Sequence, residues 1–268
     1  MPAVTLGSGL TLSYAHRGAA TEPALVLLPG PTDSWRSYEP VLDRLPPETY
    51  AISVSQRGHG DSDKPEGGYR VEDFAGDVVP LLDARGIERA VLAGHSGSCL
   101  VARRVALDHP ERIAGLVLEA SPTILRDDER LVDFVEATVS GLEDPISAEF
   151  VRSFVAGTSA AGIGADLVDL LVTEILKVPA HVWRGTFAGL LQYDDMTELG
   201  RMEAPTLLVW GDADALISRD MQDRLSGAIP DARLLVYPAL GHTPRWEDPA
   251  RFSRDLVGFV RRVARTRV

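Results

Sequence analysis

The chain begins with an alternating pattern of apolar and polar residues. Leu10, Leu12 and Tyr14 fall on one side of the pattern, and Thr11 and Ser13 fall on the other. Alternation of this kind predicts a β-strand with one buried face. We expect it to pair with residues 3–6 in an outer antiparallel hairpin.

The pattern then changes to short segments that are apolar on both faces. Six such segments follow, at residues 24–28, 51–54, 90–93, 115–118, 206–210 and 234–237. Strands of a buried parallel sheet have this character because helices cover both of their faces. Helical spacing of apolar residues lies between them, at 71–85, 100–107 and 248–263. The alternation predicts an α/β fold with a mostly parallel, doubly wound sheet, which binds ligands at the carboxyl ends of its strands.

Residues 123–193 do not follow this rhythm. They contain no apolar strand run, and Gly141, Pro145, a Gly-rich turn at 157–164 and Pro179 divide them into helical segments. We expect four short helices, inserted between core strands 6 and 7 as an all-helical lid. Residues 1–122 and 194–268 would then form the core domain, and residues 123–193 the cap.

Composition narrows the class of protein. A length of 268 residues suits one α/β domain with an insertion, and the net charge of -12 argues against binding to nucleic acid. Cys99 is the one cysteine, so no internal disulfide can form. The sequence shows neither a secretion signal nor an apolar run of membrane-spanning length, so we expect a cytoplasmic protein without a membrane partner. A homodimer remains an open alternative.

The first candidate for chemistry is Gly94-His95-Ser96-Gly97-Ser98, which follows the run 90–93 and opens a helix. A serine on such a sharp strand-to-helix turn has a strained backbone and needs small residues two positions before and after it. The turn would expose the serine oxygen and aim the Gly97 N–H at the reacting centre. Taken alone, the same residues also fit a glycine-rich turn that binds phosphate.

Two further polar residues follow apolar strand runs. Asp214 comes after the run 206–210, and His242 comes after the run 234–237. Serine is a weak nucleophile without a base, and the base needs an orienting carboxylate. Because the carboxyl ends of parallel strands share one edge of the sheet, we expect Ser96, Asp214 and His242 to converge there.

With these segments in place, the chain resembles the α/β-hydrolase family, in its serine-nucleophile branch with a helical lid. The resemblance covers nearly the whole chain and includes residues 28–30, Gln56-Arg57-Gly58-His59-Gly60-Asp61-Ser62, the turn around Ser96, residues 211–214 and Gly241-His242. It implies that Ser96 is the nucleophile, His242 the general base and Asp214 the acid that orients it. Serine at this position excludes the branch with a carboxylate nucleophile, the haloalkane dehalogenases and epoxide hydrolases.

The resemblance also supplies two alternative acids. Asp212 lies in the same loop as Asp214, although the family spacing from Gly211 favours Asp214. Glu119 lies at the end of the strand 115–118, where some family members place the acid.

One segment departs from the family pattern. The resemblance implies an oxyanion hole built from Gly97 N–H and a second N–H two residues after Pro29, which is Pro31 in this chain. Proline has no N–H to donate. Thr32 could supply its amide or hydroxyl instead, Gly97 could act with water or a lid group, or the protein could catalyse something other than ordinary ester hydrolysis. We favour Thr32.

The pocket is predicted from apolar residues near this edge of the sheet. Trp183, Phe187, Leu190 and Leu191 lie at helical spacing and either pack the lid onto the core or contact substrate. We expect an apolar pocket whose lining consists of Trp35, Trp183, Phe187 and Leu191, together with His95 beside the nucleophile.

The leading hypothesis is a serine hydrolase that cleaves an apolar ester or lactone through an acyl-enzyme on Ser96. Two alternatives keep the fold: a small-molecule sensor that binds a partner after its lid closes, and a cofactor-free oxygenase or haloperoxidase-like enzyme. The sequence has no dinucleotide fingerprint and no cluster of metal ligands, so we expect neither a cofactor nor a metal.

Overall fold

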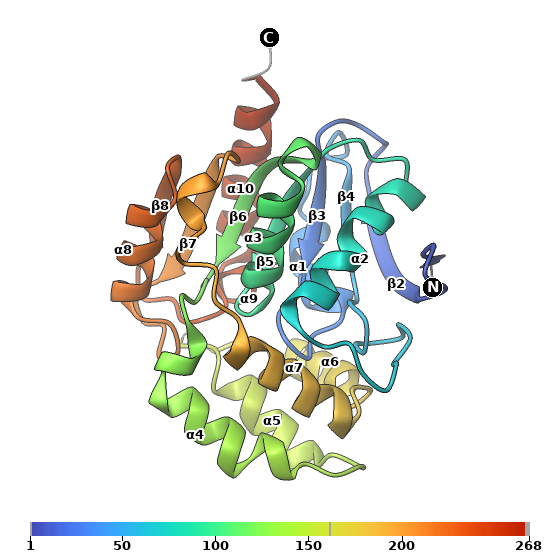
Figure 1. Cartoon of the computed structure of the whole chain (residues 1–268), viewed down its shortest axis with the longest axis vertical. Coiled ribbons are helices and arrows are strands. Elements are labelled where there is room, and N and C mark those ends of the chain that lie inside the picture. The colour runs from blue at the N-terminus through green and yellow to red at the C-terminus, as the bar shows by residue number, and fades with distance from the viewer. Residues whose placement is uncertain (1, 161, 266–268) are drawn as a thin grey trace.

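The computed structural model describes residues 2–160 and 162–265. Residues 1 and 266–268 of the predicted core and residue 161 of the predicted cap therefore lie outside the described residues. Within the described ranges the chain forms one eight-stranded sheet with helices on both faces (Figure 1). The predicted α/β fold with a mostly parallel, doubly wound sheet is confirmed.

Strand order places the predicted segments as a parallel sheet requires. From one edge to the other the strands are β1 (Ala3–Thr5), β2 (Thr11–Arg17), β4 (Ala51–Val54), β3 (Ala24–Leu28), β5 (Ala90–His95), β6 (Ile113–Glu119), β7 (Thr206–Gly211) and β8 (Ala232–Tyr237). Strands β1 and β2 form the antiparallel hairpin, β2 pairs antiparallel with β4, and the remaining pairs are parallel. Every residue of β3, β4, β5 and β7 is buried, which explains their unbroken apolar runs.

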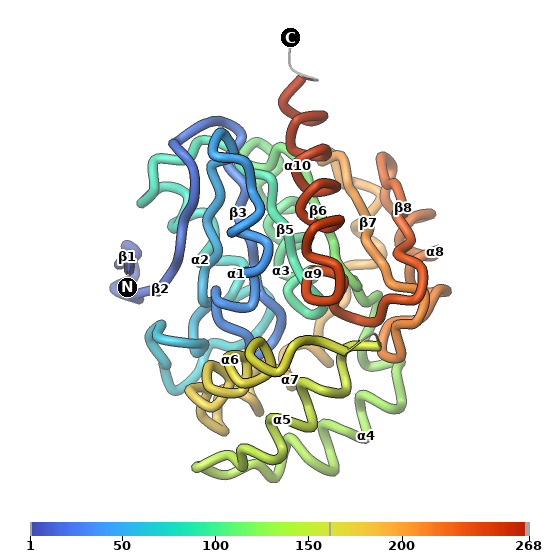
Figure 2. The backbone as a smooth tube through the Cα atoms, turned by 180° about the vertical axis from the view of Figure 1, so that it is seen from behind, coloured from blue at the N-terminus to red at the C-terminus, as the bar shows by residue number. Residues whose placement is uncertain are grey.

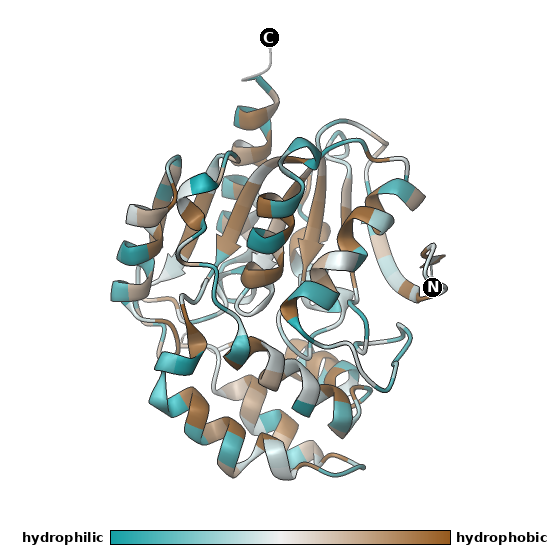
Figure 3. Ribbon diagram, viewed as in Figure 1, coloured by the Kyte–Doolittle hydropathy of each residue, from teal (hydrophilic) through white to brown (hydrophobic). Residues whose placement is uncertain are grey.

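Helices cover both faces of this sheet. In front, as Figure 1 shows, lie α2 (Val71–Ala84) and α3 (Ser98–Asp108); behind, as Figure 2 shows, lie α1 (Glu39–Leu42) and α10 (Pro249–Arg265). The edge strand β8 is flanked by α8 (Arg219–Ala228). Hydropathy follows this layering, because the central strands are brown throughout while the helices carry teal residues on their outer sides (Figure 3).

The predicted C-terminal helix is confirmed. Residues 248–263 were expected to be one helix, and α10 runs from Pro249 to Arg265. The structure adds a short helix that was not predicted, α9 (Pro244–Glu247), directly before it. Proline fits the first turn of a helix because its missing N–H has no intrahelical partner there. Each proline therefore starts a helix of its own.

The segment between β6 and β7 is helical, as predicted. It contains α4 (Glu129–Ala137), α5 (Ala148–Ala156), α6 (Ala165–Ile175) and α7 (Ala180–Gln192). Short 3-10 turns accompany them at η3 (Leu125–Asp127) and η4 (Val139–Gly141), and others occur elsewhere at η1 (Trp35–Tyr38), η2 (Pro110–Arg112) and η5 (Leu199–Arg201). This helical segment (residues 123–193) lies across the carboxyl ends of the parallel strands, at the bottom of Figure 1.

One buried arginine binds both connections of the helical segment to the core. Arg103 of α3 has a fully buried side chain, and its Nε and Nη2 atoms donate to the Asp195 carboxylate at 2.9 and 2.7 Å. Its Nη1 atom donates to Ser121 Oγ at 3.2 Å and to the Pro122 carbonyl at 2.7 Å. The chain entering the helical segment and the chain leaving it are therefore fixed by the same guanidinium.

Across the described ranges, no helix combines the length and the apolar character that crossing a bilayer requires.

Candidate active site

Ser96 lies on the sharp turn between β5 and α3. Its backbone has a φ of 53°, in the left-handed region that L-residues rarely adopt. A Cβ atom on Gly94 would lie only 2.6 Å from the backbone oxygen of Ser98, so glycine is required there. The turn is held against the end of β6 by a hydrogen bond from Ser96 N–H to the Glu119 carbonyl at 2.9 Å. The local geometry is that of the strained elbow predicted from the sequence.

Ser98, which stands where the family more often has glycine, has a structural reason to be present. Its buried hydroxyl donates to the Pro29 carbonyl at 2.6 Å, and Gln56 Nε2 donates to the same hydroxyl at 2.8 Å. Gln56 also donates to the Pro29 carbonyl at 3.1 Å. These bonds join the turn after β3 to the start of α3. Sequence reasoning did not assign this role to Gln56 or Ser98.

Asp214 and His242 meet as predicted. Asp214 Oδ2 lies 2.9 Å from His242 Nδ1, and both side chains are buried. The other carboxylate oxygen, Oδ1, accepts from the backbone N–H groups of Leu216 at 2.8 Å and Ile217 at 3.0 Å. Because backbone donors fix Oδ1, Oδ2 is presented to the imidazole in one orientation.

The two alternative acids have other partners. Asp212 is exposed, and its Oδ1 accepts from the backbone N–H of Ala239 at 2.6 Å in the turn after β8. Glu119 is fully buried, and its carboxylate accepts from Arg245 N at 2.9 Å and Arg245 Nη1 at 3.2 Å. His242 therefore pairs with Asp214, the favoured acid, and neither alternative acid, Asp212 or Glu119, is its hydrogen-bond partner.

His95 holds the loop that carries His242 through a contact with its backbone. Its Nε2 atom lies 3.1 Å from the His242 carbonyl, and the two rings are 4.8 Å apart at an angle of 60°. Burial, reinforced by the nearby Arg245, holds the pKa of His95 well below its usual value, so the ring is neutral. A neutral ring bonded in this way carries its proton on Nε2 and donates it to the His242 carbonyl.

The turn after β3 forms the wall of the site that faces Gly97. Pro31 packs on the turn that holds Ser96, since a Cβ atom on Gly97 would lie 2.8 Å from Pro31 Cγ. Pro31 and Gly97 both line the cavity described below, whereas Thr32 does not. Thr32 is only 1% exposed, its φ is 74°, and its hydroxyl has no hydrogen-bond partner within the described residues. The contribution of Thr32 to an oxyanion hole therefore stays a prediction.

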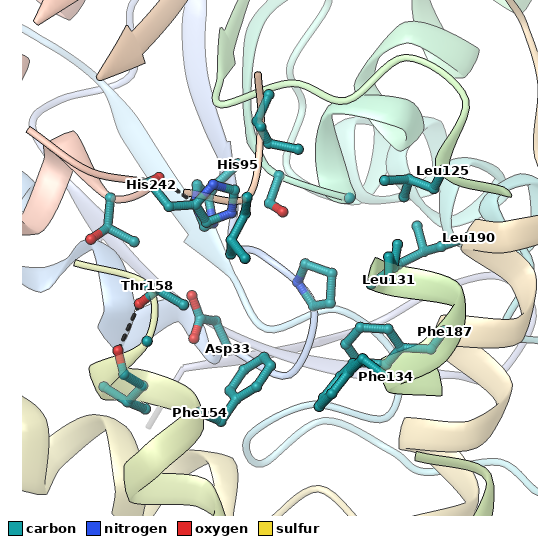
Figure 4. Close-up of a pocket in the computed structure, with 18 of the residues that line it drawn as sticks. Asp33, His95, Leu125, Leu131, Phe134, Phe154, Thr158, Phe187, Leu190 and His242 are labelled. Carbon is teal, nitrogen blue, oxygen red and sulfur yellow. Dashed lines mark hydrogen bonds between the residues drawn. The ribbon is translucent and has the colours of Figure 1, made fainter. Parts of the chain in front are cut away.

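A cavity of about 320 Å³ lies between the sheet and the helical segment (Figure 4). Ser96 and His242 line the cavity on the side of the sheet, and residues from α4, α5 and α7 form its wall on the side of the helical segment. Most of that wall is apolar, and includes Leu131, Phe134, Phe154, Phe187 and Leu190. A cavity of this size and character suits a small ligand with an apolar body.

Only some of the predicted pocket residues line this cavity. His95 and Phe187 do, but Trp35, Trp183 and Leu191 do not. Trp183 is fully buried one helical turn before Phe187, where its ring stacks on that phenylalanine at 5.8 Å. Leu190, one turn after Phe187, reaches the cavity in place of Leu191, because residues three or four apart share a helix face. Trp35 packs against the core on the α1 side of the sheet.

Asp33 is a cavity residue that the sequence analysis did not select. It is 5% exposed, and its Oδ2 atom accepts from Arg245 Nη2 at 2.8 Å. Burial raises its pKa to about 6, although Arg245 and the Ser37 hydroxyl favour the charged form. The signal in the sequence was weak because an aspartate in Thr-Asp-Ser before a helical turn reads as an ordinary cap.

Comparison with known proteins assigns the fold to a family. The model of the alpha/beta hydrolase fold family matches residues 23–249 of this chain. The chain therefore belongs to the α/β-hydrolase family.

Its relatives extend this assignment to activity. The chain is similar to a 2-hydroxy-6-oxononadienedioate/2-hydroxy-6-oxononatrienedioate hydrolase of Burkholderia vietnamiensis, at 30% identity over 96% of this chain and 93% of the relative. It is also similar to a 2-(acetamidomethylene)succinate hydrolase of Mesorhizobium japonicum, at 27% identity over 94% and 92%. Among solved structures, Est816, described as an N-acyl homoserine lactone degrading enzyme, has 26% identity and a TM-score of 0.81 over 96% of this chain and all of that chain. The first two of these relatives are named as hydrolases, and hydrolysis is the class of activity that they support.

Proposed function

We propose that this protein is a serine hydrolase that cleaves an ester or lactone with an apolar body through an acyl-enzyme on Ser96. The observation that carries the proposal is the hydrogen bond between Asp214 and His242 at 2.9 Å, beside a strained serine in one shared cavity. The apolar cavity wall favours the apolar substrate. The likeness to Est816 favours lactones as one part of the substrate range.

Each residue has a defined task in this mechanism. His242 takes the proton of Ser96 Oγ as that oxygen attacks the carbonyl carbon, and then gives it to the departing alcohol. Asp214 keeps the proton of the neutral imidazole on Nδ1, which leaves Nε2 free to act as the base. A water molecule, activated by His242, then releases the acid and restores Ser96.

Stabilisation of the oxyanion is the unusual part of this proposal. Gly97 supplies one N–H at the start of α3, and Pro31 on the opposite wall supplies none. The loss of one oxyanion donor costs about 3 kcal/mol in a well-studied protease. We therefore propose that Thr32, water or a group from the helical segment supplies the second bond, and that residues 123–193 act as the lid over the site.

The test is covalent labelling of Ser96. The protein, its Ser96→Ala variant and a Ser153→Ala variant are treated with a fluorophosphonate and weighed by intact mass spectrometry. Ser153 lies on the cavity wall in α5, so it is a matched control for nonspecific reaction with a cavity serine. We expect a single adduct on the wild type and on Ser153→Ala, and none on Ser96→Ala.

Turnover is then measured with a panel of alkyl esters and lactones. An adduct that persists in Ser96→Ala, or a wild type that neither reacts with the reagent nor turns over any member of the panel, would contradict the proposed hydrolase.

A further inference from the structure

The cavity contains a buried carboxylate beside the reacting groups that the proposed mechanism does not use. Asp33 lines the cavity, and Figure 4 shows it between His242 and Phe154. It lies two residues after Pro31, which packs on Gly97 next to Ser96. Asp33 thus faces the reacting end of the cavity, while Phe134 and Phe187 line the end under the helical segment.

Asp33 is held rigidly in this position by Arg245. The guanidinium of Arg245 is fully buried, donates to Asp33 at 2.8 Å and to Glu119 at 3.2 Å, and lies over the ring of Trp246 at 4.3 Å. Glu119 also accepts from the backbone N–H of Arg245. With its partner fixed on several sides, the Asp33 carboxylate loses little conformational entropy when it binds a ligand.

Asp33 retains the capacity to accept another hydrogen bond. Arg245 occupies part of its carboxylate, which offers about four acceptor positions. Several other polar groups of the cavity are already engaged. The Thr158 hydroxyl donates to the Val155 carbonyl at 2.7 Å, Thr243 Oγ1 bonds to Ser159 at 2.7 Å, and Asp128 caps α4. An acceptor that lacks water or a donor in an apolar cavity is costly, so a ligand that supplies a donor gains affinity.

We propose that Asp33 is a specificity-determining residue that selects substrates with an O–H or N–H donor next to the scissile carbonyl. The inference rests on the proposed function, because it concerns the substrate of the same site. It narrows that function to esters or lactones whose apolar chain or ring carries a hydroxyl or amide N–H at the carbon beside the reacting carbonyl. The apolar body lies against the aromatic residues of the helical segment, and the donor binds Asp33.

The experiment compares two substrates that differ only in this donor. The values of kcat/KM for methyl 2-hydroxyoctanoate and methyl octanoate are measured by pH-stat for the wild type, Asp33→Asn and Glu119→Gln. In Asp33→Asn the amide oxygen can still accept from Arg245, and its NH2 group then faces the cavity, where it opposes a donor. We expect the preference for the hydroxy ester to fall by about 10- to 100-fold in Asp33→Asn, which is the range for a hydrogen bond to a charged acceptor.

Glu119→Gln is the matched control. This substitution neutralises a second carboxylate that binds Arg245, but Glu119 does not line the cavity. We expect its ratio of the two kcat/KM values to equal that of the wild type. Because each variant is compared through a ratio, the greater intrinsic reactivity of the hydroxy ester cancels.

A second measurement does not need turnover. Two ketones that differ only in the hydroxyl donor, 3-hydroxynonan-2-one and nonan-2-one, are compared for their ability to protect Ser96 from the fluorophosphonate. Protection reports binding of the donor directly. We expect the preference for the hydroxy ketone to fall in Asp33→Asn as it does for the hydroxy ester. An unchanged ratio in Asp33→Asn by both readouts overturns the role of Asp33 and leaves the hydrolase proposal intact. Absence of both the adduct and turnover in the wild type overturns both proposals.

Discussion

Replacement of Asp214 by asparagine separates the chemistry of the site from its folding. Asp214 Oδ1 accepts from two backbone N–H groups, at Leu216 and Ile217, and Oδ2 binds His242 Nδ1. The backbone donors cannot change their character, so the single oxygen of the introduced amide must take the Oδ1 position. Its NH2 group then faces His242 and can bond only to an Nδ1 atom that has no proton. The imidazole proton is thereby moved to Nε2, the atom that must accept the proton of Ser96.

The size of the effect follows from this tautomer change. A protease with the same substitution in its triad, in which the geometry stays intact, loses about 10⁴ in kcat. We expect a loss of similar order here, both in ester turnover and in the rate of fluorophosphonate labelling. Stability should change little, because each buried polar atom keeps a partner. Asp214→Ala, in contrast, removes the acceptor of two backbone N–H groups and of the buried His242, and a buried polar group left unsatisfied costs about 1–3 kcal/mol.

The assay is the labelling rate, measured with urea unfolding of the same samples. Asp212→Asn is the control, because Asp212 is exposed and binds Ala239 N–H rather than His242. A rate for Asp214→Asn within tenfold of the wild type would refute the assignment of Asp214 as the group that sets the tautomer. So would an equal loss in Asp212→Asn.

Two further predictions concern stability. Asp195→Ala leaves the buried Arg103 without its carboxylate, so we expect the free energy of unfolding in urea to fall by about 3–5 kcal/mol. Adding Arg103→Met to the same chain should restore part of this loss. A loss under about 1 kcal/mol would contradict the expected energy of the pair. Burial lowers the pKa of His59 from 6.5 to about 4, so the stability that the neutral ring contributes is complete above pH 6.5 and is lost as the pH falls toward 4. The loss amounts to about 3 kcal/mol, and the unfolding free energy of His59→Asn should fall less steeply over this range; parallel slopes would show that His59 is not the titrating group.

The sheet could be predicted almost to the residue because its strands are buried on both faces. The run 24–28 is β3 and the run 51–54 is β4, without any change of bounds. Strand ends were harder to predict where the residues beside an apolar run can also adopt a strand conformation. An example is β6, which starts two residues before the predicted run. The four-residue helix α9 was missed because so short an element shows no apolar periodicity in the sequence.

The site was predictable where chemistry restricts the residue types, and less so where packing decides. Ser96, Asp214 and His242 follow three separate strands, and strand order alone brings such residues to one edge of the sheet. The cavity wall depends on the rotation of α7, and a helix with apolar residues on adjacent positions does not reveal from its sequence whether Leu190 or Leu191 faces inward. Asp33 depends on a contact with Arg245, 212 residues away, that no local pattern records.

The arrangement around Arg103 bears on how such a protein can diversify. Because this side chain belongs to the core and fixes the chain at Pro122 and at Asp195, both junctions are set independently of what lies between them. The intervening stretch can therefore be exchanged as a cassette if the replacement reproduces its contacts with the core. These include the Thr158 carbonyl, which accepts from the His242 N–H at 3.0 Å, and the ion pair of Lys177 with Asp61 at 3.0 Å. Recombination at these two junctions is a route by which substrate range can change in one step while the strands that carry the reacting groups are inherited unaltered.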